Sequence, residues 1–501
     1  MKKHFIKDKK YKLNEVFEVI TKKPKIFLDV NVEDLVRCSK KTVDSILNSS
    51  KTVYGINTGF GKLSQVKIPK TQLIKLQKNL LLSHSVGLGK PVDDDVVWTM
   101  IFIKIVSLSK GFSGISLELL NKLVFILNSG YLPIIPSKGS VGASGDLAPL
   151  AHMALPLINE GKVRNKNKEF QSKDIFKFNY SLKPKEGLAI INGTQFSCSL
   201  GIVSLLKINR LVKIADIVAA LSFEGLLGTI AAFREDVQNV KMHSEQIKVA
   251  KNLNFLLKNS QINDSLRDPG KVQDMYSLRC IPQVHGASRQ SLLSVNKIIE
   301  NEMNSVSDNP IVLSNSNEIV SAGHFHAEII AQALDNAAIA VSSLANISER
   351  RIYSLIDGDF GLPPFLIDNA GVNSGYMMLQ VTAASLVSEN KTLSHPASVD
   401  SIPTGAGQED HVSMAPWSGR KLLKIIKNTE KVIAIELLLS VQALYFRKGY
   451  KPAKNLIKLN DFLMENIKKI KNDKYFNDEL NFAMDLISSG NILNYVSKKI
   501  K

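Results

Sequence analysis

The chain is poor in cysteine and in acidic residues. Three cysteines in 501 residues, Cys38, Cys198 and Cys280, are too few and too scattered for a disulfide framework or a zinc ribbon. Acidic residues number 46 against 64 lysines and arginines. Such cysteine usage is typical of a reducing compartment, and we therefore expect a cytoplasmic protein.

Long apolar runs without ionisable side chains are also missing. The most hydrophobic stretch, residues 217–233, is interrupted by Glu224, and residues 432–446 contain Glu436 and Gln442. A membrane span needs about 20 predominantly apolar residues. Both stretches therefore predict buried helices of a bundle, and we expect no membrane partner.

The excess of basic residues gives a formal net charge of +18, which raises the possibility of a nucleic-acid partner. The lysines are dispersed, however, with small clusters only at the two ends and at residues 162–168. Basic and aromatic residues do not alternate, and no nucleic-acid motif is present. The first ten residues are basic, but no apolar core follows them, so they do not predict a secretory signal. We interpret the charge as a solvated lysine-rich surface that binds no nucleic acid.

The hydrophobic pattern changes after about residue 195. The first part mixes short helical patterns with loops that contain glycine and proline, whereas the rest is dominated by Leu, Ile and Ala at helical spacing. The clearest helical stretches are residues 192–233, 327–356, 380–393 and 420–447. These patterns predict a mainly α fold, with a loop-rich N-terminal part (1–195) and a long-helix bundle (196–501).

The most informative segment is GSVGASGDLAPLAH, residues 139–152. A serine-hydrolase elbow requires Gly-x-Ser-x-Gly, but Asp146 stands two residues after Ser144. A phosphate-binding loop requires a lysine after the glycines, and none is present. The segment leads directly into an apolar, helix-compatible stretch, so it is not a flexible linker.

This segment resembles the signature of the aromatic amino acid ammonia-lyases, the family of histidine, phenylalanine and tyrosine ammonia-lyases. The resemblance implies a helical fold of the ammonia-lyase and fumarase/aspartase type. It also implies that Ala143, Ser144 and Gly145 cyclise and lose water to form 4-methylidene-imidazol-5-one (MIO), an electrophile that needs no external cofactor. The small side chains suit a sharply folded backbone. Asp146 is a plausible N-cap of the helix that follows.

Two further segments match the same family. YGINTGFG, residues 54–61, lacks the glycine spacing of a dinucleotide fingerprint and matches the family's mobile tyrosine loop. The resemblance makes Tyr54 the base that removes the β-proton, a role that requires a lowered pKa. GLAIINGT, residues 187–194, makes Asn192 the residue that holds the MIO ring, although Asn-Gly is also a common turn.

KVQDMYSLR, residues 271–279, places Gln273, Tyr276 and Arg279 three residues apart, which on a helix would align them on one face. The resemblance implies that Arg279 binds the substrate carboxylate and that Tyr276 orients the substrate, with Gln273 beside them. Met275 stands where the family often has proline. A polar face of an amphipathic helix would explain the spacing equally well.

SAGHFHAE, residues 321–328, matches a family segment in which Phe325 packs beside the active site. His324, His326 and Glu328 could be taken for metal ligands. This spacing is weak support for a metal site, and the family's chemistry needs no metal, so we expect none.

Two residues bear on the substrate. His84, in LSHSVG, matches histidine and tyrosine ammonia-lyases better than the phenylalanine enzymes, and Glu409, in QEDH, matches the histidine enzymes. A carboxylate suits an N–H donor ring and suits a phenyl ring badly. Residues 394–400 also match the histidine branch.

The resemblance thus implies elimination of ammonia from L-histidine to give trans-urocanate, the first step of histidine degradation in this family. A tyrosine ammonia-lyase or an MIO-dependent aminomutase would keep the same catalytic residues. A noncatalytic basic binding protein would explain the charge but not the motifs. The family's enzymes are homotetramers with active sites shared between subunits, so we expect a homotetramer here.

Overall fold

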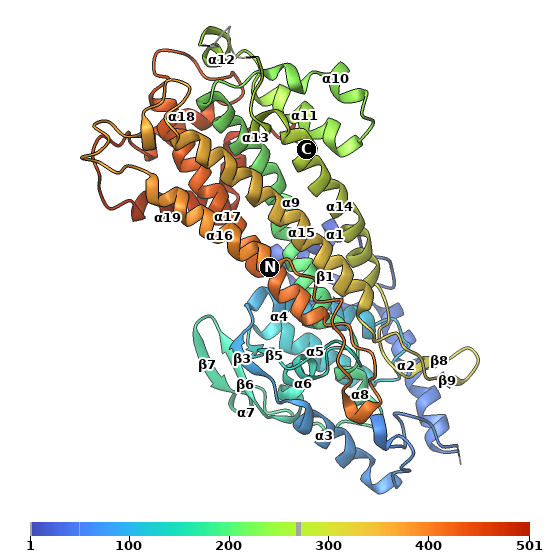
Figure 1. Cartoon of the computed structure of the whole chain (residues 1–501). Helices are drawn as coiled ribbons and strands as arrows, with labels where there is room; N and C mark the ends of the chain where they lie inside the picture. The colour runs from blue at the N-terminus through green and yellow to red at the C-terminus, as the bar shows by residue number, and fades with distance from the viewer. Residues whose placement is uncertain (1–2, 50, 267–271, 501) are drawn as a thin grey trace. The chain divides into compact units, whose positions relative to one another are not determined.

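The computed structural model describes residues 3–49, 51–266 and 272–500 and is mainly helical (Figure 1), which confirms the predicted fold class. The strands are only two to four residues long and form small sheets: β1 with β2, β3 with β5, β4 with β6 and β7, and β8 with β9. The first pair is parallel and the others are antiparallel. Among the described helices, none has both the length and the apolar character needed to span a membrane.

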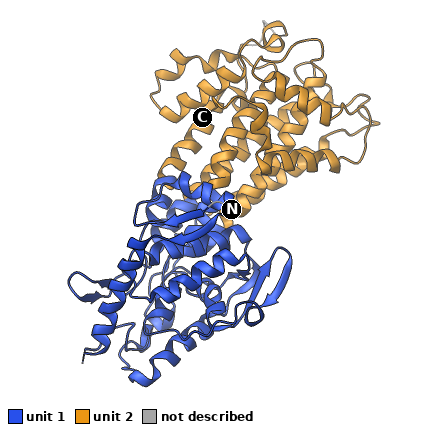
Figure 2. Cartoon of the chain, turned by 180° about the vertical axis from the view of Figure 1, so that it is seen from behind, with its two compact units in different colours: residues 1–204, 296–335, 396–420 blue, residues 205–295, 336–395, 421–501 orange. Residues whose placement is uncertain are grey.

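The chain forms two compact units (Figure 2). Unit 1 contains residues 1–204, 296–335 and 396–420, and unit 2 contains the remaining segments. In unit 1 the N-terminal part predicted from the sequence extends to residue 204 and is joined by two further segments, 296–335 and 396–420, that the sequence predicts in the long-helix bundle. Four long helices contribute residues to both units: α9 (Gln195–Gly225), α14 (Ile281–Glu302), α15 (Glu328–Ile356) and α17 (Ala415–Tyr445).

Unit 1 is built around α4 (Asp94–Leu108), in which every residue from Val96 to Leu108 is buried. This continuous burial agrees with an almost uninterrupted apolar sequence that contains a single charged residue, Lys104. The other elements of unit 1 are β1 (Lys3–Ile6), α1 (Leu13–Lys22), β2 (Lys25–Leu28), α2 (Val30–Leu47), η1 (Gly61–Leu63), η2 (Lys70–Gln72), α3 (Leu73–His84), β3 (Leu88–Pro91), α5 (Leu117–Ser129), β4 (Leu132–Pro133), β5 (Pro136–Lys138), α6 (Leu147–Ala154), η3 (Leu155–Ile158), β6 (Lys162–Asn165), β7 (Lys168–Gln171), α7 (Ser172–Ile175), α8 (Glu186–Ile191), β8 (Ile311–Leu313), β9 (Glu318–Val320) and η6 (Gly405–Gly407).

Unit 2 is a helical bundle whose interior is formed by parts of the four long helices. Its remaining elements are η4 (Ile230–Phe233), α10 (Glu235–Asn239), α11 (Ser244–Leu256), α12 (Gln261–Ser265), α13 (Tyr276–Arg279), η5 (Pro364–Leu366), α16 (Met377–Leu393), α18 (Ile457–Asn466), α19 (Asn477–Ser489) and η7 (Asn491–Tyr495). Three of the predicted long helices, α15, α16 and α17, begin and end within five residues of their predicted limits.

The first predicted helix, over residues 192–233, is too long. Helix α9 ends at Gly225, and Leu227 adopts a left-handed conformation with φ of 52°. The amide of Gly228 donates to the carbonyl of Phe223 (3.0 Å), a hydrogen bond that closes the helix end. This end is hard to predict from the sequence because leucine, and not glycine, occupies the left-handed position.

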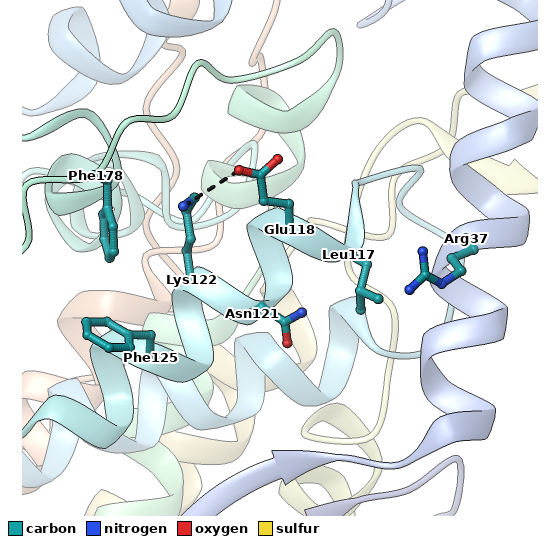
Figure 3. Close-up of a pocket in the computed structure, with 7 residues that line it drawn as sticks. All are labelled: Arg37, Leu117, Glu118, Asn121, Lys122, Phe125 and Phe178. Atoms are coloured by element: carbon teal, nitrogen blue, oxygen red, sulfur yellow. Dashed lines mark ion pairs between the residues drawn. The ribbon is translucent and has the colours of Figure 1, made fainter.

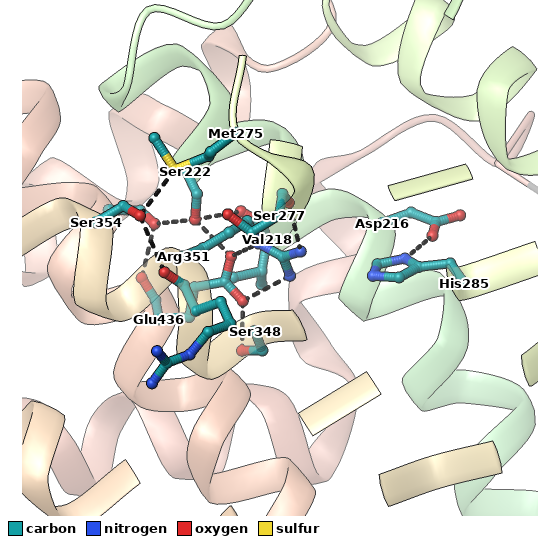
Figure 4. A network of polar contacts seen from close by, with 12 residues as sticks. Asp216, Val218, Ser222, Met275, Ser277, His285, Ser348, Arg351, Ser354 and Glu436 are labelled. Atoms are coloured by element: carbon teal, nitrogen blue, oxygen red, sulfur yellow. Dashed lines mark hydrogen bonds and ion pairs between the residues drawn. The ribbon is translucent and has the colours of Figure 1, made fainter. Parts of the chain in front are cut away.

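A buried polar network crosses the interior of unit 2 (Figure 4). Arg351 and Glu436 are both fully buried and form an ion pair, with Nε and Oε1 2.5 Å apart. The Arg351 Nη1 group also donates to the carbonyl of Ser277 in α13 (3.4 Å), and Ser354 Oγ donates to Met275 Sδ (2.8 Å). The network therefore ties the short helix α13 to α15 and α17.

Candidate active site

Three helices of unit 1 bring the segments of the candidate site together. Helices α3, α6 and α8 pack against one another (Figure 1). His84 is the last residue of α3, Asp146 is the N-cap of α6, and Asn192 is the C-cap of α8. The tripeptide 143–145 precedes α6, so helix packing places it beside both His84 and Asn192.

The backbone at Gly145 is tightly enclosed. Gly145 has φ of 78°, and a Cβ atom there would lie 2.4 Å from the carbonyl oxygen of Gly193. The amide of Asp146 donates to the same oxygen (2.7 Å). Only glycine fits at position 145 under these conditions. The sharply folded and confined backbone fits the cyclised group that the family resemblance implies.

Asp146 occupies the predicted N-cap position, but its carboxylate does not cap α6. Instead it accepts hydrogen bonds from the amide of Ser197 (2.8 Å) and from Ser197 Oγ (2.9 Å). Burial raises the pKa of Asp146 to about 6, against the lowering effect of these hydrogen bonds. Asp146 thus ties the segment that follows the tripeptide to the start of α9.

Asn192 lies against the tripeptide. Its Nδ2 group donates to the carbonyl oxygen of Ser144 (3.3 Å), and its buried Oδ1 has no partner within the described residues. Lys104 Nζ donates to the carbonyl of Asn192 (2.7 Å) and to Gln195 Oε1 (3.3 Å). Burial lowers the pKa of Lys104 to about 7. Lys104 belongs to none of the sequence motifs, although a lone lysine in the apolar run 100–106 is a detectable signal.

Glu409 contacts the central serine of the tripeptide. Ser144 Oγ donates to Glu409 Oε1 at 2.5 Å, a short, charge-assisted contact. The two residues are 265 positions apart in the sequence. The structure therefore brings the segment 139–152, which contains Ser144, into contact with the Gln-Glu-Asp-His motif, which contains Glu409.

A cavity of about 1300 Å³ opens onto these residues. Its lining includes seven residues that the sequence singled out: Tyr54, His84, Ala143, Ser144, Asn192, Phe325 and Glu409. It also includes His326, Asp410 and His411, to which the sequence motifs assign no role in binding substrate. Among the described residues, no group of three or more His, Cys, Asp or Glu side chains is arranged to hold a metal ion. His324 is exposed and does not line the cavity.

The surroundings of Tyr54 differ from those expected of a base. Burial raises the pKa of Tyr54; a hydrogen bond with the Gly61 backbone acts against this, and the nearby Glu409 adds to it. Burial likewise lowers the pKa of His84, partly offset by Glu409. The role of base that the resemblance implies requires a lowered pKa, whereas burial and a carboxylate in these surroundings both favour the neutral phenol.

Gln273, Tyr276 and Arg279 belong to unit 2 and are not among the lining residues of the cavity. The predicted common helix face is wrong, because α13 begins only at Tyr276 and Met275 is extended. Gln273 is exposed, and Tyr276 has 71% of its surface accessible to solvent. The Arg279 guanidinium lies over the Tyr276 ring, 4.6 Å from its centroid.

A second cavity of about 470 Å³ lies elsewhere in unit 1, between α2 and α5 (Figure 3). Arg37, Lys122, Phe125 and Phe178 contribute to its lining, and Lys122 pairs with Glu118 at 3.7 Å. None of the residues that the sequence singled out lines it, so the larger cavity is the candidate active site.

Comparison with known proteins agrees with the motifs. The family model for aromatic amino acid lyases matches residues 11–465. A histidine ammonia-lyase from Alkaliphilus oremlandii is 42% identical over the full length of both chains, and one from Idiomarina loihiensis is 46% identical over 93% of this chain and 92% of its own. The crystal structure of histidine ammonia-lyase from Trypanosoma cruzi superimposes with a TM-score of 0.91 at 36% identity, covering 100% of this chain and 96% of that one.

The helical fold and the confined Ala-Ser-Gly segment are those of an enzyme of the aromatic amino acid lyase class. The chain belongs to the aromatic amino acid lyase family.

Proposed function

We propose that this protein is a histidine ammonia-lyase, which eliminates ammonia from L-histidine to give trans-urocanate. The observation that carries the proposal is the cavity in which His84 and Glu409 lie beside the Ala-Ser-Gly segment. The names of the full-length relatives at 42–46% identity support the same substrate. We also propose that the enzyme is cytoplasmic.

Ala143, Ser144 and Gly145 are proposed to form MIO. When present, this group supplies an electrophile for the amino group of the substrate, because an unmodified amine is a poor leaving group. Asn192, through its contact with the Ser144 carbonyl, and Gly145, through its confined backbone, would hold it. The N-terminus of α6 follows the tripeptide directly, and its partial positive charge suits an electrophile there.

His84 and Glu409 are proposed to orient the imidazole of the substrate. A carboxylate accepts a hydrogen bond from an imidazole N–H, and a histidine can donate to or accept from the other ring nitrogen. Phe325 contributes an apolar wall to the same cavity. Tyr54, also in the lining, is the proposed acceptor of the β-proton.

The carboxylate of the substrate requires a cation, and Lys62 is the only lysine or arginine in the described lining of the cavity. We propose that Arg279, with Tyr276 and Gln273, comes from a neighbouring subunit of a homotetramer. A cation placed there would bind the substrate carboxylate and would also lower the pKa of Tyr54. This arrangement would explain how Tyr54 can act as a base although burial within its own chain raises its pKa.

Separate incubation with L-histidine, L-tyrosine and L-phenylalanine tests the proposal. Urocanate should form fastest, as measured by ultraviolet absorbance and mass. Formation of coumarate faster than urocanate would favour a tyrosine ammonia-lyase. A β-amino acid product would favour an aminomutase, an outcome to include because tyrosine aminomutase from Streptomyces globisporus superimposes with a TM-score of 0.92 at 29% identity over 98% of both chains.

A further inference from the structure

Lys104 is a buried cation whose hydrogen bonds both go to the turn that carries Asn192. The residue is only 1% exposed and lies in the interior of α4. Its Nζ group donates to the carbonyl of Asn192 (2.7 Å) and to Gln195 Oε1 (3.3 Å), which are both neutral acceptors. Burial of an ammonium group without an ion-pair partner is costly. An apolar side chain would suit the stability of α4 better, so the ammonium group points to a role at the turn.

The carboxylates whose charges act on Lys104 are engaged by other groups. Asp308 and Asp146 both act to raise the pKa of Lys104, but burial outweighs them. Asp308 Oδ2 accepts from Lys185 Nζ (2.7 Å), and both of these residues are buried. Asp146 accepts from the amide and the hydroxyl of Ser197. A buried ion pair therefore does not explain the presence of Lys104.

The turn contacted by Lys104 also contacts the backbone of the tripeptide segment. Asn192 ends α8 with an extended backbone, φ −86° and ψ 129°, and its carbonyl accepts from Lys104. The carbonyl of the next residue, Gly193, accepts from the Asp146 amide (2.7 Å). A Cβ atom at Gly193 would lie 2.4 Å from Gln195 Oε1, the second acceptor of Lys104. Lys104 therefore fixes the peptide group that directly precedes the contact with the tripeptide segment.

The side chain of Asn192 depends on this backbone for its position. Its Nδ2 group donates to the Ser144 carbonyl (3.3 Å), whereas its buried Oδ1 atom has no partner within the described residues. Under the function proposed above, the Ser144 carbonyl is conjugated with the Cα=Cβ bond that dehydration of Ser144 creates. A hydrogen-bond donor at this carbonyl withdraws electron density and favours loss of the Cα proton. Accurate placement of Asn192 therefore matters for maturation of the tripeptide.

We propose that Lys104 is a positioning residue that holds Asn192 on the Ser144 carbonyl and thereby sets the rate at which the tripeptide matures. The proposal rests on the function proposed above. Maturation releases one water when the Gly145 nitrogen bonds to the Ala143 carbonyl carbon, and a second when Ser144 loses its hydroxyl group and its Cα hydrogen. Lys104 takes no part in these bond changes and acts only through Asn192.

The test follows the mass of the peptide that contains residues 143–145 over time after cell-free synthesis of the full chain. Lys104→Met removes the ammonium group and should slow the loss of two waters by roughly 10- to 100-fold, the effect of a displacement of about 1 Å. Lys104→Arg keeps a cationic donor and should mature faster than Lys104→Met. Lys421→Met is the matched control and should mature at the wild-type rate. Lys421 is 2% exposed and donates to the carbonyl of His395, and neither residue lines the cavity.

A double-mutant comparison tests whether Lys104 acts through Asn192. When residue 192 is already alanine, Lys104→Met should slow maturation further by less than roughly threefold. Circular dichroism and thermal unfolding establish that the compared proteins are folded, and Lys104→Gln carries the test with the same expectation if Lys104→Met is not.

Three results would overturn the proposal. They are maturation of Lys104→Met at the wild-type rate, equal slowing by Lys421→Met, and an undiminished effect of Lys104→Met in the Asn192→Ala background. A folded Lys104→Arg variant that matures no faster than Lys104→Met would also contradict it. Failure of the proposed function has a different signature, because the wild-type peptide would then retain both waters.

Discussion

At the scale of single residues, the cavity combines groups whose surroundings favour neutral forms. Tyr54 has a raised pKa and His84 a lowered one, both mainly through burial. The negative charge of Glu409 acts on both groups: it raises the pKa of Tyr54 further and partly offsets the lowering of the pKa of His84. Within the described part of the chain, both side chains are therefore held toward their neutral forms.

Replacement of Tyr54 by phenylalanine tests the role of the hydroxyl. The variant keeps the ring and its packing but lacks the proposed acceptor of the β-proton. We expect the turnover number to fall by roughly two to four decades while the Michaelis constant changes little. The tripeptide should still lose two waters, because Tyr54 lies outside it. Near-normal turnover by the matured variant would remove Tyr54 as the base.

Lys104 predicts a pH dependence of stability. Its pKa is lowered from 10.5 to about 7, so between these values the unfolded chain binds a proton that the folded chain does not. The free energy of unfolding should therefore rise with pH in this window, by at most about 1.4 kcal/mol per pH unit from this residue. Unfolding of wild type and of Lys104→Met at pH 7, 8 and 9 measures the effect.

The matched comparison isolates the lysine from the other titrating groups. The difference in unfolding free energy, wild type minus Lys104→Met, should become more positive from pH 7 to pH 9. A difference that stays constant over this range contradicts a folded-state pKa near 7.

At the scale of elements, helix α13 carries Tyr276 and Arg279, two of the residues proposed to bind the substrate. The helix is short, but contacts with other elements hold it in place. Arg351 and Ser354 of α15 bind Ser277 and Met275, and Asp274 Oδ2 accepts from the Thr229 amide (2.6 Å). These contacts fix the segment on both sides of Tyr276, whose ring remains exposed.

Replacement of Arg279 by glutamine tests whether α13 binds the substrate carboxylate. The variant loses a charge-assisted interaction worth about 1.5–3 kcal/mol, so the Michaelis constant for histidine should rise by roughly 10- to 150-fold. Turnover falls as well if the substrate tilts away from the tripeptide. Unchanged kinetics in steady-state assays would assign Arg279 a role outside the site.

The sequence predicted elements best where the apolar period is strong. The limits of α15, α16 and α17 were close, whereas α14 was not among the stretches singled out because its sequence is rich in polar residues. The end of α9 was missed because a leucine takes the left-handed position. For the candidate site, motifs predict seven of the residues that line the cavity. A lone lysine in an apolar run marks Lys104, but the residues that it contacts leave no motif.

At the scale of the whole molecule, the residues with proposed roles are divided between the two units. The described lining of the cavity comes from unit 1, whereas Gln273, Tyr276 and Arg279 belong to unit 2. A homotetramer with shared sites would supply the second set from another chain.

Mixed oligomers test this sharing. Tyr54→Phe and Arg279→Gln should each be nearly inactive alone, yet their co-expression should restore about a quarter of the wild-type sites if the two residues come from different chains. Purification through two different tags isolates the mixed species. Sites built within one chain would give no recovery, since each chain then carries one defect.

The most direct measurement is the intact mass of the purified protein, followed by the mass of the peptide that contains residues 143–145. The wild-type protein should be lighter than its encoded chain by two waters, both missing from this peptide. Ser144→Ala should keep the fold, show no loss from dehydration of the serine, and lose nearly all activity. An unmodified mass in soluble, active wild-type protein would contradict the account.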